Sequence, residues 1–244
     1  MKSKIILLLI LGSGILISCS ILESYIMGEP IGSGVNQPST SSSIVSDDVP
    51  EVDVKLSCPD DKHPHAIAMG GGYWACCNVG ASKPEEIGES YSWGETWTKD
   101  EHDYFSYERP RYRDDDKYLK DIVRSPFDVA NVKWGGKWQM PSKDAIAFLK
   151  RNNSFKKVKY KGVIGYLVSS ANNKIFLPLK DTKYTYYWTS QMKYVDYVGS
   201  DLDHWYIYAY CLQLANEIGV YPVEDECSRE ASLEGYVRPY YKHN

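Results

Sequence analysis

Residues 134–142 read WGGKWQMPS, and this stretch marks the point where the chain enters its clearest helix. Ser142 is a residue type that caps helix N-termini, and Asp144 suits the positive end of the helix dipole. The apolar residues that follow share one helix face: Ala145, Phe148 and Leu149. The pattern therefore predicts an amphipathic helix that begins just after Ser142.

The chain on either side of this helix is predicted to form few helices and many strands. A short helix is expected at 128–132, and short strands at 66–69 and 73–77. After the main helix, aromatic and β-branched residues predict a hairpin over 157–168 that turns at Lys161-Gly162. Further strands are expected at 175–179, 186–189, 205–214 and 236–240, whereas 98–120 is polar and irregular. This order predicts an α+β fold with a mostly antiparallel sheet, two short helices and long loops.

The N-terminus has the features of a secretion signal. Lys2 and Lys4 precede an apolar run at 5–17, which has the length of a signal-peptide core. The sequence Leu-Ile-Ser-Cys at 16–19 then resembles the lipobox of bacterial lipoproteins, in which the cysteine is acylated. We expect a signal peptide at 1–18 and lipidation of Cys19; an ordinary signal peptide or a membrane anchor is the alternative. The predicted location is the cell envelope, as an outer-membrane lipoprotein that faces the periplasm or the exterior.

A tether and a folded domain are expected to follow. Residues 28–50 contain 13 Gly, Pro, Ser or Thr among 23 and have no aromatic or basic residue. Such a segment buries too little apolar surface to offset its ordering entropy. We therefore assign 19–51 to a flexible tether and 52–244 to the folded domain.

Composition excludes several classes of protein. The chain of 244 residues is 43% hydrophobic and 25% charged, as in globular proteins. Its net charge of −4 argues against nucleic acid as a partner, because phosphate binding needs a basic face. The single long apolar run excludes a protein with several membrane spans. The membrane is expected as a partner only through the N-terminal lipid.

Several blocks of the sequence together resemble one known family. They lie at 73–86 (YWACCNVGASKPEE), 91–96 (YSWGET), 134–142, 175–178 (IFLP), 187–190 (YWTS) and 235–239 (GYVRP). In this order and spacing the chain resembles the Fibrobacter succinogenes major paralogous domain family. The resemblance implies a C-type-lectin-like fold, related to the core of formylglycine-generating enzymes. It also implies a secreted or lipid-anchored bacterial surface protein, and it implies no established activity.

Most of the motif residues have a structural interpretation. Five tryptophans are expected to be core anchors whose indole N–H groups bond to backbone: Trp74, Trp93, Trp134, Trp138 and Trp188. Four glycines fit tight turns: Gly80, Gly94, Gly135 and Gly136. Arg238 is expected to be a partly buried guanidinium with its hydrogen bonds satisfied.

The favoured function is non-catalytic recognition of a glycan or surface-protein ligand. C-type-lectin-like folds hold irregular loops over a sheet, and tyrosine gives large contact area at low rotamer cost. The candidate ligand-binding residues are Tyr194, Asp196, Tyr197, Asp201, Asp203, His204, Tyr221, Glu224, Asp225, Glu226 and Arg229. The stretch 223–234 is acidic where the family is rich in Tyr and Asn, which puts this face in doubt or favours basic partners. Alternatively, the late tyrosines merely cover the sheet.

Two other function classes stay open. One is a structural surface or fimbria-associated protein without a small ligand. The other is an enzyme of the formylglycine-generating type, which would need two thiolates in one accessible site. Cys76 and Cys77 are neighbours on a predicted strand, so their side chains are expected on opposite faces. The prediction is therefore that the chain is not an enzyme and has no catalytic residues.

No cofactor and no metal ion are predicted. His63 and His65 lack an evident third ligand at a suitable spacing. The run 114–116 (DDD) lacks the alternating spacing and the glycine of a calcium loop. Asp201, Asp203 and His204 form a somewhat better cluster for a cation or for sugar hydroxyls.

The cysteine count is odd once Cys19 is set aside. Six cysteines minus this one leave five, in a compartment where disulfides form. The family pattern implies that Cys77 is a buried, unpaired residue. The predicted disulfides are Cys58–Cys76 and Cys211–Cys227, although four cysteines allow three connectivities.

Overall fold

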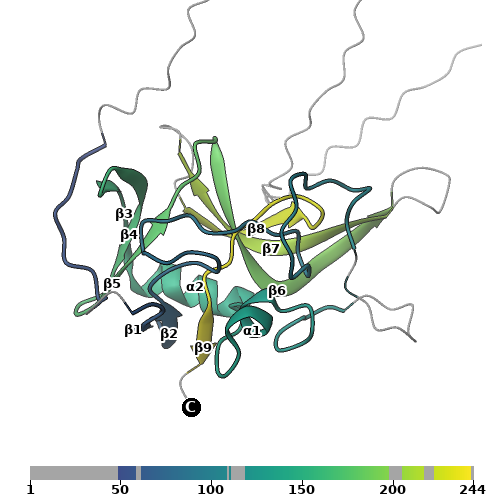
Figure 1. The fold of residues 1–244 in the computed structure, drawn as a ribbon, viewed down its shortest axis with the longest axis horizontal. Coiled ribbons are helices and arrows are strands. Elements are labelled where there is room, and N and C mark those ends of the chain that lie inside the picture. Colours follow the sequence, from purple (N-terminus) through teal and green to yellow (C-terminus); the bar gives the residue numbers. More distant parts are fainter. Residues whose placement is uncertain are drawn as a thin grey trace, which may run out of the picture. The chain divides into compact units, whose positions relative to one another are not determined.

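The computed structural model describes residues 49–58, 62–108, 110, 119–197, 205–216 and 223–242, and the statements below concern these residues. The element order is β1 (Ala66–Met69), β2 (Gly72–Ala75), α1 (Val129–Trp134), α2 (Lys143–Asn152), β3 (Ser154–Tyr160), β4 (Val163–Ser169), β5 (Lys174–Pro178), β6 (Tyr184–Tyr197), β7 (Trp205–Ala215), β8 (Val223–Glu230) and β9 (Tyr240–Lys242). Figure 1 shows these elements along the chain. The predicted α+β class with mostly antiparallel strands and two short helices is confirmed. The signal peptide, Cys19 and most of the tether lie outside the described residues.

The strands form three small antiparallel sheets. Their strand orders are β1-β2-β9, β3-β4-β5 and β6-β7-β8. Two hairpins have two-residue turns, at Gly70-Gly71 and at Lys161-Gly162, and all four turn residues have positive φ. This conformation matches the twist of paired strands, and glycine adopts it at least cost. The predicted turn at Lys161-Gly162 is thus confirmed.

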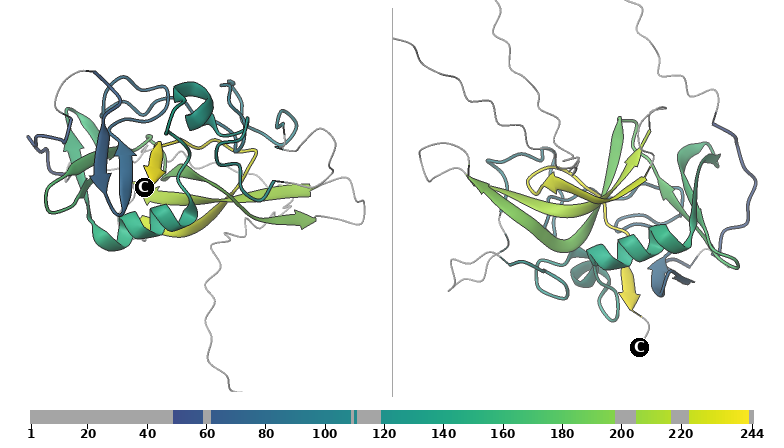
Figure 2. Two further views of the ribbon diagram at one scale, coloured as in Figure 1. Left: turned by 90° about the horizontal axis from the view of Figure 1, so that it is seen from below. Right: turned by 180° about the vertical axis from the view of Figure 1, so that it is seen from behind.

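α2 begins just after Ser142, as predicted, whereas the short helix predicted at 128–132 spans Val129–Trp134, with Asp128 as its cap. The Ser142 hydroxyl accepts a hydrogen bond from the Ala145 N–H at 3.1 Å, which caps α2. The Asp128 carboxylate does the same for α1, through the Asn131 N–H at 3.1 Å. α2 then contacts β6, β7 and β8, and Figure 2 shows it beside those strands from two sides. Among the described residues, no helix is long and apolar enough to cross a membrane.

Three apolar clusters make up the core. The largest lies between α2 and the β1-β2 and β3-β4-β5 sheets, and includes Trp74, Cys76 and Cys77. A second, around Trp93 and Trp188, lies against one face of β7. The third lies on the other face of β3-β4-β5, where Leu56 packs with Val158 and Phe176. Residues 49–58, named here the leading segment, therefore cover this sheet.

Several strand predictions need correction. β2 ends at Ala75, so Cys76 and Cys77 are not strand residues, and β9 is confined to Tyr240–Lys242. Tyr236, predicted to lie within a strand, forms only an isolated parallel bridge to Tyr187. β6 is longer than predicted, and β8 adds a strand in the acidic stretch. These strands depend on pairing between distant segments, which local sequence patterns do not reveal.

The tryptophans are only partly as predicted. The indole N–H groups of Trp93 and Trp188 donate to the backbone carbonyls of Thr189 and Tyr91, both at 2.8 Å. Trp74 is equally buried, but its indole nitrogen has no hydrogen-bond partner. Trp134 and Trp138 are half-buried rather than central, and they pack edge-on against each other. The predicted burial is therefore confirmed for Trp74, Trp93 and Trp188 and wrong for Trp134 and Trp138, and the predicted indole hydrogen bond is wrong for Trp74.

Candidate functional site

The predicted ligand-binding residues are only partly within the described structure. Asp201, Asp203, His204 and Tyr221 lie outside the described residues. Asp196 and Tyr197 are on β6, and Glu224, Asp225 and Glu226 on β8, but their side chains also lie outside the described part. Tyr194 and Arg229 are fully described, so the site is built here from these two and from their neighbours.

Tyr194 is the exposed member of a row of otherwise half-buried tyrosines on the β6-β7-β8 sheet. It lies opposite Tyr208, and the two rings stack with centroids 4.7 Å apart and planes 19° from parallel. Tyr206, Tyr208 and Tyr210 alternate along β7 with the buried residues Ile207 and Ala209. Because side chains alternate across a strand, these tyrosines share the face that points away from the second core cluster.

Two lysines flank the same tyrosines. The pairing of β6 with β7 shifts register between Met192 and Tyr194, an irregularity that accommodates Lys193. The Lys193 ammonium lies 5.9 Å from the Tyr194 ring centroid and 5.6 Å from that of Tyr210. Lys143, at the start of α2, lies 4.9 Å from the Tyr210 centroid. We name Lys143, Lys193, Tyr194, Tyr208 and Tyr210 the tyrosine strip.

Arg229 lies apart from the tyrosine strip. Its guanidinium lies 4.0 Å from the Tyr186 ring centroid, and its Nε donates to the Glu234 carbonyl at 3.1 Å. Ser228, the preceding residue, pairs with Tyr210 and contacts Lys193, so Arg229 points to the opposite face of β8. The structure therefore does not bring Arg229 together with Tyr194, and the single predicted face is wrong in this respect.

Arg229 lines a small pocket whose charges are already paired. The cavity, of about 100 Å³, is bounded by Lys180, Tyr186, Arg229, Glu234 and their neighbours. The Lys180 ammonium contacts both carboxylate oxygens of Glu234, at 2.6 and 2.8 Å. This internal ion pair leaves the pocket little unpaired charge to offer a ligand.

A second, basic pocket lies at the C-terminal end of the described chain. It measures about 330 Å³, and it is lined by Arg124, Lys137, Gln139, Tyr241 and Lys242. The Arg124 guanidinium donates to the Gln139 side chain at 3.0 Å and to the carbonyls of Gly136 and Lys137. Arg124 is therefore bound mainly to the 134–142 stretch, where it supports the turn before α2.

The cysteines differ from the prediction at one point. Because β2 ends at Ala75, strand alternation does not govern the next two residues, and Cys76 and Cys77 are both buried in the largest core cluster. The expectation that Cys76 and Cys77 point to opposite faces is therefore wrong, and it gives no argument against a shared site. Cys77 is fully buried, as predicted.

The predicted disulfide partners are near each other. Cys211 and Cys227 are register partners of β7 and β8. Cys58 and Cys76 are thiols in this structure, and their sulfur atoms lie within 4.8 Å. Both disulfides stay predictions.

Sequence reasoning missed one group of side chains. The ligand atoms of Cys58, His63, His65 and Cys76 all lie within 4.8 Å of one another. The signal was partly visible in the two histidines separated by one residue and in the nearby Cys58. Cys76 was predicted only as a disulfide partner of Cys58, and the fold brings the two histidines to this pair.

Comparison with known proteins found no matching family model, no similar curated protein and no similar solved structure.

Proposed function

We propose that this chain is a membrane-anchored cell-envelope lipoprotein whose C-type-lectin-like domain binds a ligand without catalysis. The family resemblance of the motif blocks supports the fold assignment, and the mixed α+β architecture is compatible with it. Acylation of Cys19 and the tether would hold the domain near the membrane surface.

The observation that carries the binding proposal is the tyrosine strip. Tyr194 is 43% exposed although it is a large ring on a strand, and it stacks on Tyr208 instead of entering the core. Lysine ammonium groups lie over these rings, so the surface offers flat apolar faces and positive charge together.

This combination fits an acidic glycan better than a neutral one. A sugar ring presents C–H groups to an aromatic face, and an ammonium group pairs with a carboxylate or sulfate. The charges of Lys143 and Lys193 therefore favour an anionic ligand, whereas the acidic stretch of the sequence alone favoured a cationic one.

A glycan array probed with the full-length chain tests this proposal. We expect binding to glycans that carry carboxylate or sulfate groups, and loss of most of that signal in Lys193→Ala and Tyr194→Ala. The matched control is Lys183→Ala with Tyr184→Ala, because Lys183 lies 5.5 Å from the Tyr184 centroid at the other end of β6. Equal loss in both pairs, or binding that all four substitutions leave unchanged, would place the site elsewhere.

A further inference from the structure

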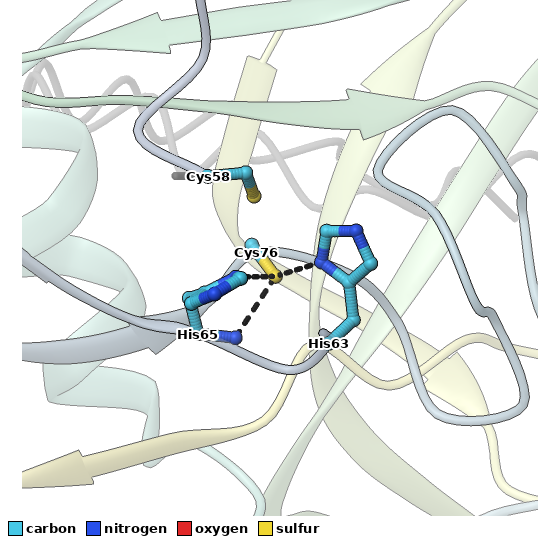
Figure 3. A group of neighbouring side chains, drawn as sticks. All are labelled: Cys58, His63, His65 and Cys76. Atoms are coloured by element: carbon cyan, nitrogen blue, oxygen red, sulfur yellow. Dashed lines mark hydrogen bonds between the residues drawn. The ribbon is translucent and has the colours of Figure 1, made fainter. Parts of the chain in front are cut away.

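Four potential metal ligands converge beside the β1-β2 hairpin. Figure 3 shows the side chains of Cys58, His63 and His65 directed toward the sulfur of Cys76. Cys58 is the last residue of the leading segment. The two histidines lie just before β1, and Cys76 directly follows β2. Among the residues that the structure describes, these four form the one group of His, Cys, Asp and Glu side chains close enough to hold a metal ion.

The distances suit a tetrahedral ion of the size of zinc. Zn–S bonds of about 2.3 Å and Zn–N bonds of about 2.0–2.1 Å place sulfur and nitrogen about 3.6 Å apart in a tetrahedron. The Cys76 sulfur lies 3.0 Å from Nδ1 of His63 and 3.7 Å from Nδ1 of His65. All pairs of ligand atoms lie within 4.8 Å, so shifts of roughly 1 Å complete the geometry.

A backbone donor also faces the Cys76 sulfur. The backbone N–H of His65 donates to this sulfur at 3.0 Å, as outer-shell groups do at metal sites. The buried Arg238 guanidinium donates to the Asn78 amide oxygen and to the carbonyls of Ala75 and Phe176, so it holds the residue on each side of the Cys76-Cys77 pair.

We propose that Cys58, His63, His65 and Cys76 bind one Zn²⁺ ion. Two thiolates and two neutral imidazoles fill all four positions, which makes this a closed, structural site rather than a catalytic one. Each thiol releases its proton to solvent when the ion binds. The site takes the place of the predicted Cys58–Cys76 disulfide, because a disulfide would not account for two imidazoles directed at the same sulfur.

The ion would fasten the leading segment to the domain. This segment runs beside β3, where the Val52 N–H donates to the Lys159 carbonyl at 2.9 Å. Farther along, the Ser57 N–H donates to the Lys174 carbonyl of β5 at 3.2 Å. The Zn²⁺ site adds a link from Cys58 to both ends of the β1-β2 hairpin. The proposed Zn²⁺ site would thus lie close to the point where the predicted tether joins the folded domain.

Metal content of the full-length chain tests this proposal. The chain is purified without added metal or chelator, and its zinc is measured by elemental analysis against protein concentration. We expect one zinc per chain, and Co²⁺ titrated into the metal-free protein should give the absorption bands of tetrahedral, thiolate-bound cobalt. A chain without zinc in which non-reducing peptide mapping finds Cys58 bonded to Cys76, and that binds no Co²⁺ after reduction, would overturn the proposal in favour of the disulfide.

Variants separate this site from adventitious binding. Cys58→Ser and His65→Asn change half-buried residues, and each should weaken zinc binding by about 100-fold or more, since loss of even an outer-shell partner costs 10–100-fold. His102→Asn is the matched control, because His102 is half-buried and contacts Ser90 and Ser92 instead. Far-ultraviolet circular dichroism checks that each variant is folded. Full zinc content in folded Cys58→Ser and His65→Asn would contradict the assignment.

Discussion

The Nδ1 atom of His63 lies 3.0 Å from the Sγ atom of Cys76, across the full length of the β1-β2 hairpin in sequence. The spacing of the two residues in the sequence does not by itself make them neighbours. The contact arises because β2 returns antiparallel to β1 and places Cys76 beside the residues that precede β1: the Cys76 N–H donates to the His65 carbonyl at 3.1 Å. Strand pairing thus brings together a histidine and a cysteine that are distant in the sequence, and both become potential ligands of one ion.

Removal of the metal should lower thermal stability. A ligand at 100 times its dissociation constant stabilises the folded state by about 2.7 kcal/mol. At about 2–4 °C per kcal/mol for a domain of this size, a chelator should lower the melting temperature by roughly 5–10 °C. Differential scanning calorimetry of the full-length chain, with and without chelator, measures this. Cys58→Ser should show no chelator effect, and an equal effect in that variant would indicate binding elsewhere.

Asp128 should be among the most costly polar residues to remove. Its carboxylate is fully buried and accepts from the N–H groups of Arg124 at 2.8 Å, Asn131 at 3.1 Å and Met140 at 3.0 Å. Burial raises the pKa of this carboxyl group, and the three N–H donors oppose that shift. Asp128→Ala leaves three N–H groups unsatisfied, at about 1–3 kcal/mol each, so we expect destabilisation of about 3 kcal/mol or more.

Asp144→Ala is the control for this prediction. Asp144 is also acidic and lies in the first turn of a helix, but it is exposed. Its loss should cost no more than about 1 kcal/mol, the usual size of an interaction with the helix dipole. Urea denaturation of both variants gives the two values, and similar costs would contradict the structural role given to Asp128.

His102 should make stability fall as the pH is lowered. Its two ring nitrogens lie 2.9 Å from the Ser92 hydroxyl and 3.2 Å from the Ser90 hydroxyl. Burial lowers the pKa of His102; Lys99 and Lys180 lower it further, whereas Glu234 and Glu95 act in the opposite direction. Below its ordinary pKa of about 6.5, the unfolded chain binds a proton that the folded chain resists, so stability decreases as pH falls.

The measurement is the free energy of unfolding between pH 7.5 and 5.5, in chelator so that zinc does not contribute. His102→Gln keeps hydrogen-bonding groups but does not titrate, so its stability should fall less over this range. An identical pH dependence in both proteins would show that other groups are responsible.

Cys19 is predicted to be the membrane anchor. Cys19→Ala removes the acylation site, so the protein should leave the membrane fraction, because an acyl chain contributes about 0.8 kcal/mol per buried CH₂ group. Detergent phase partitioning of the two proteins measures this. Cys58→Ser is the control cysteine, and it should partition like the wild type; unchanged partitioning of Cys19→Ala would mean that another feature holds the protein at the membrane.

Local features of the fold could be predicted from the sequence. The α2 cap at Ser142 and the turn at Lys161-Gly162 depend on neighbouring residues alone, and both are confirmed. β8 carries an acidic sequence and forms because β7 lies beside it, so its own pattern does not predict a strand. The candidate metal ligands were missed because Cys58 and Cys76 were predicted to form a disulfide, and because no local spacing places His63 and His65 beside Cys76.

The metal site is the central claim of this account, and X-ray absorption at the zinc edge of the zinc-loaded, full-length chain tests it most directly. We predict a first shell of two sulfur atoms at about 2.3 Å and two nitrogen atoms at about 2.0–2.1 Å. Cys58→Ser should lose one of the two sulfur scatterers. A first shell of oxygen and nitrogen alone, or two sulfur scatterers that persist in Cys58→Ser, would contradict a zinc site built from Cys58, His63, His65 and Cys76.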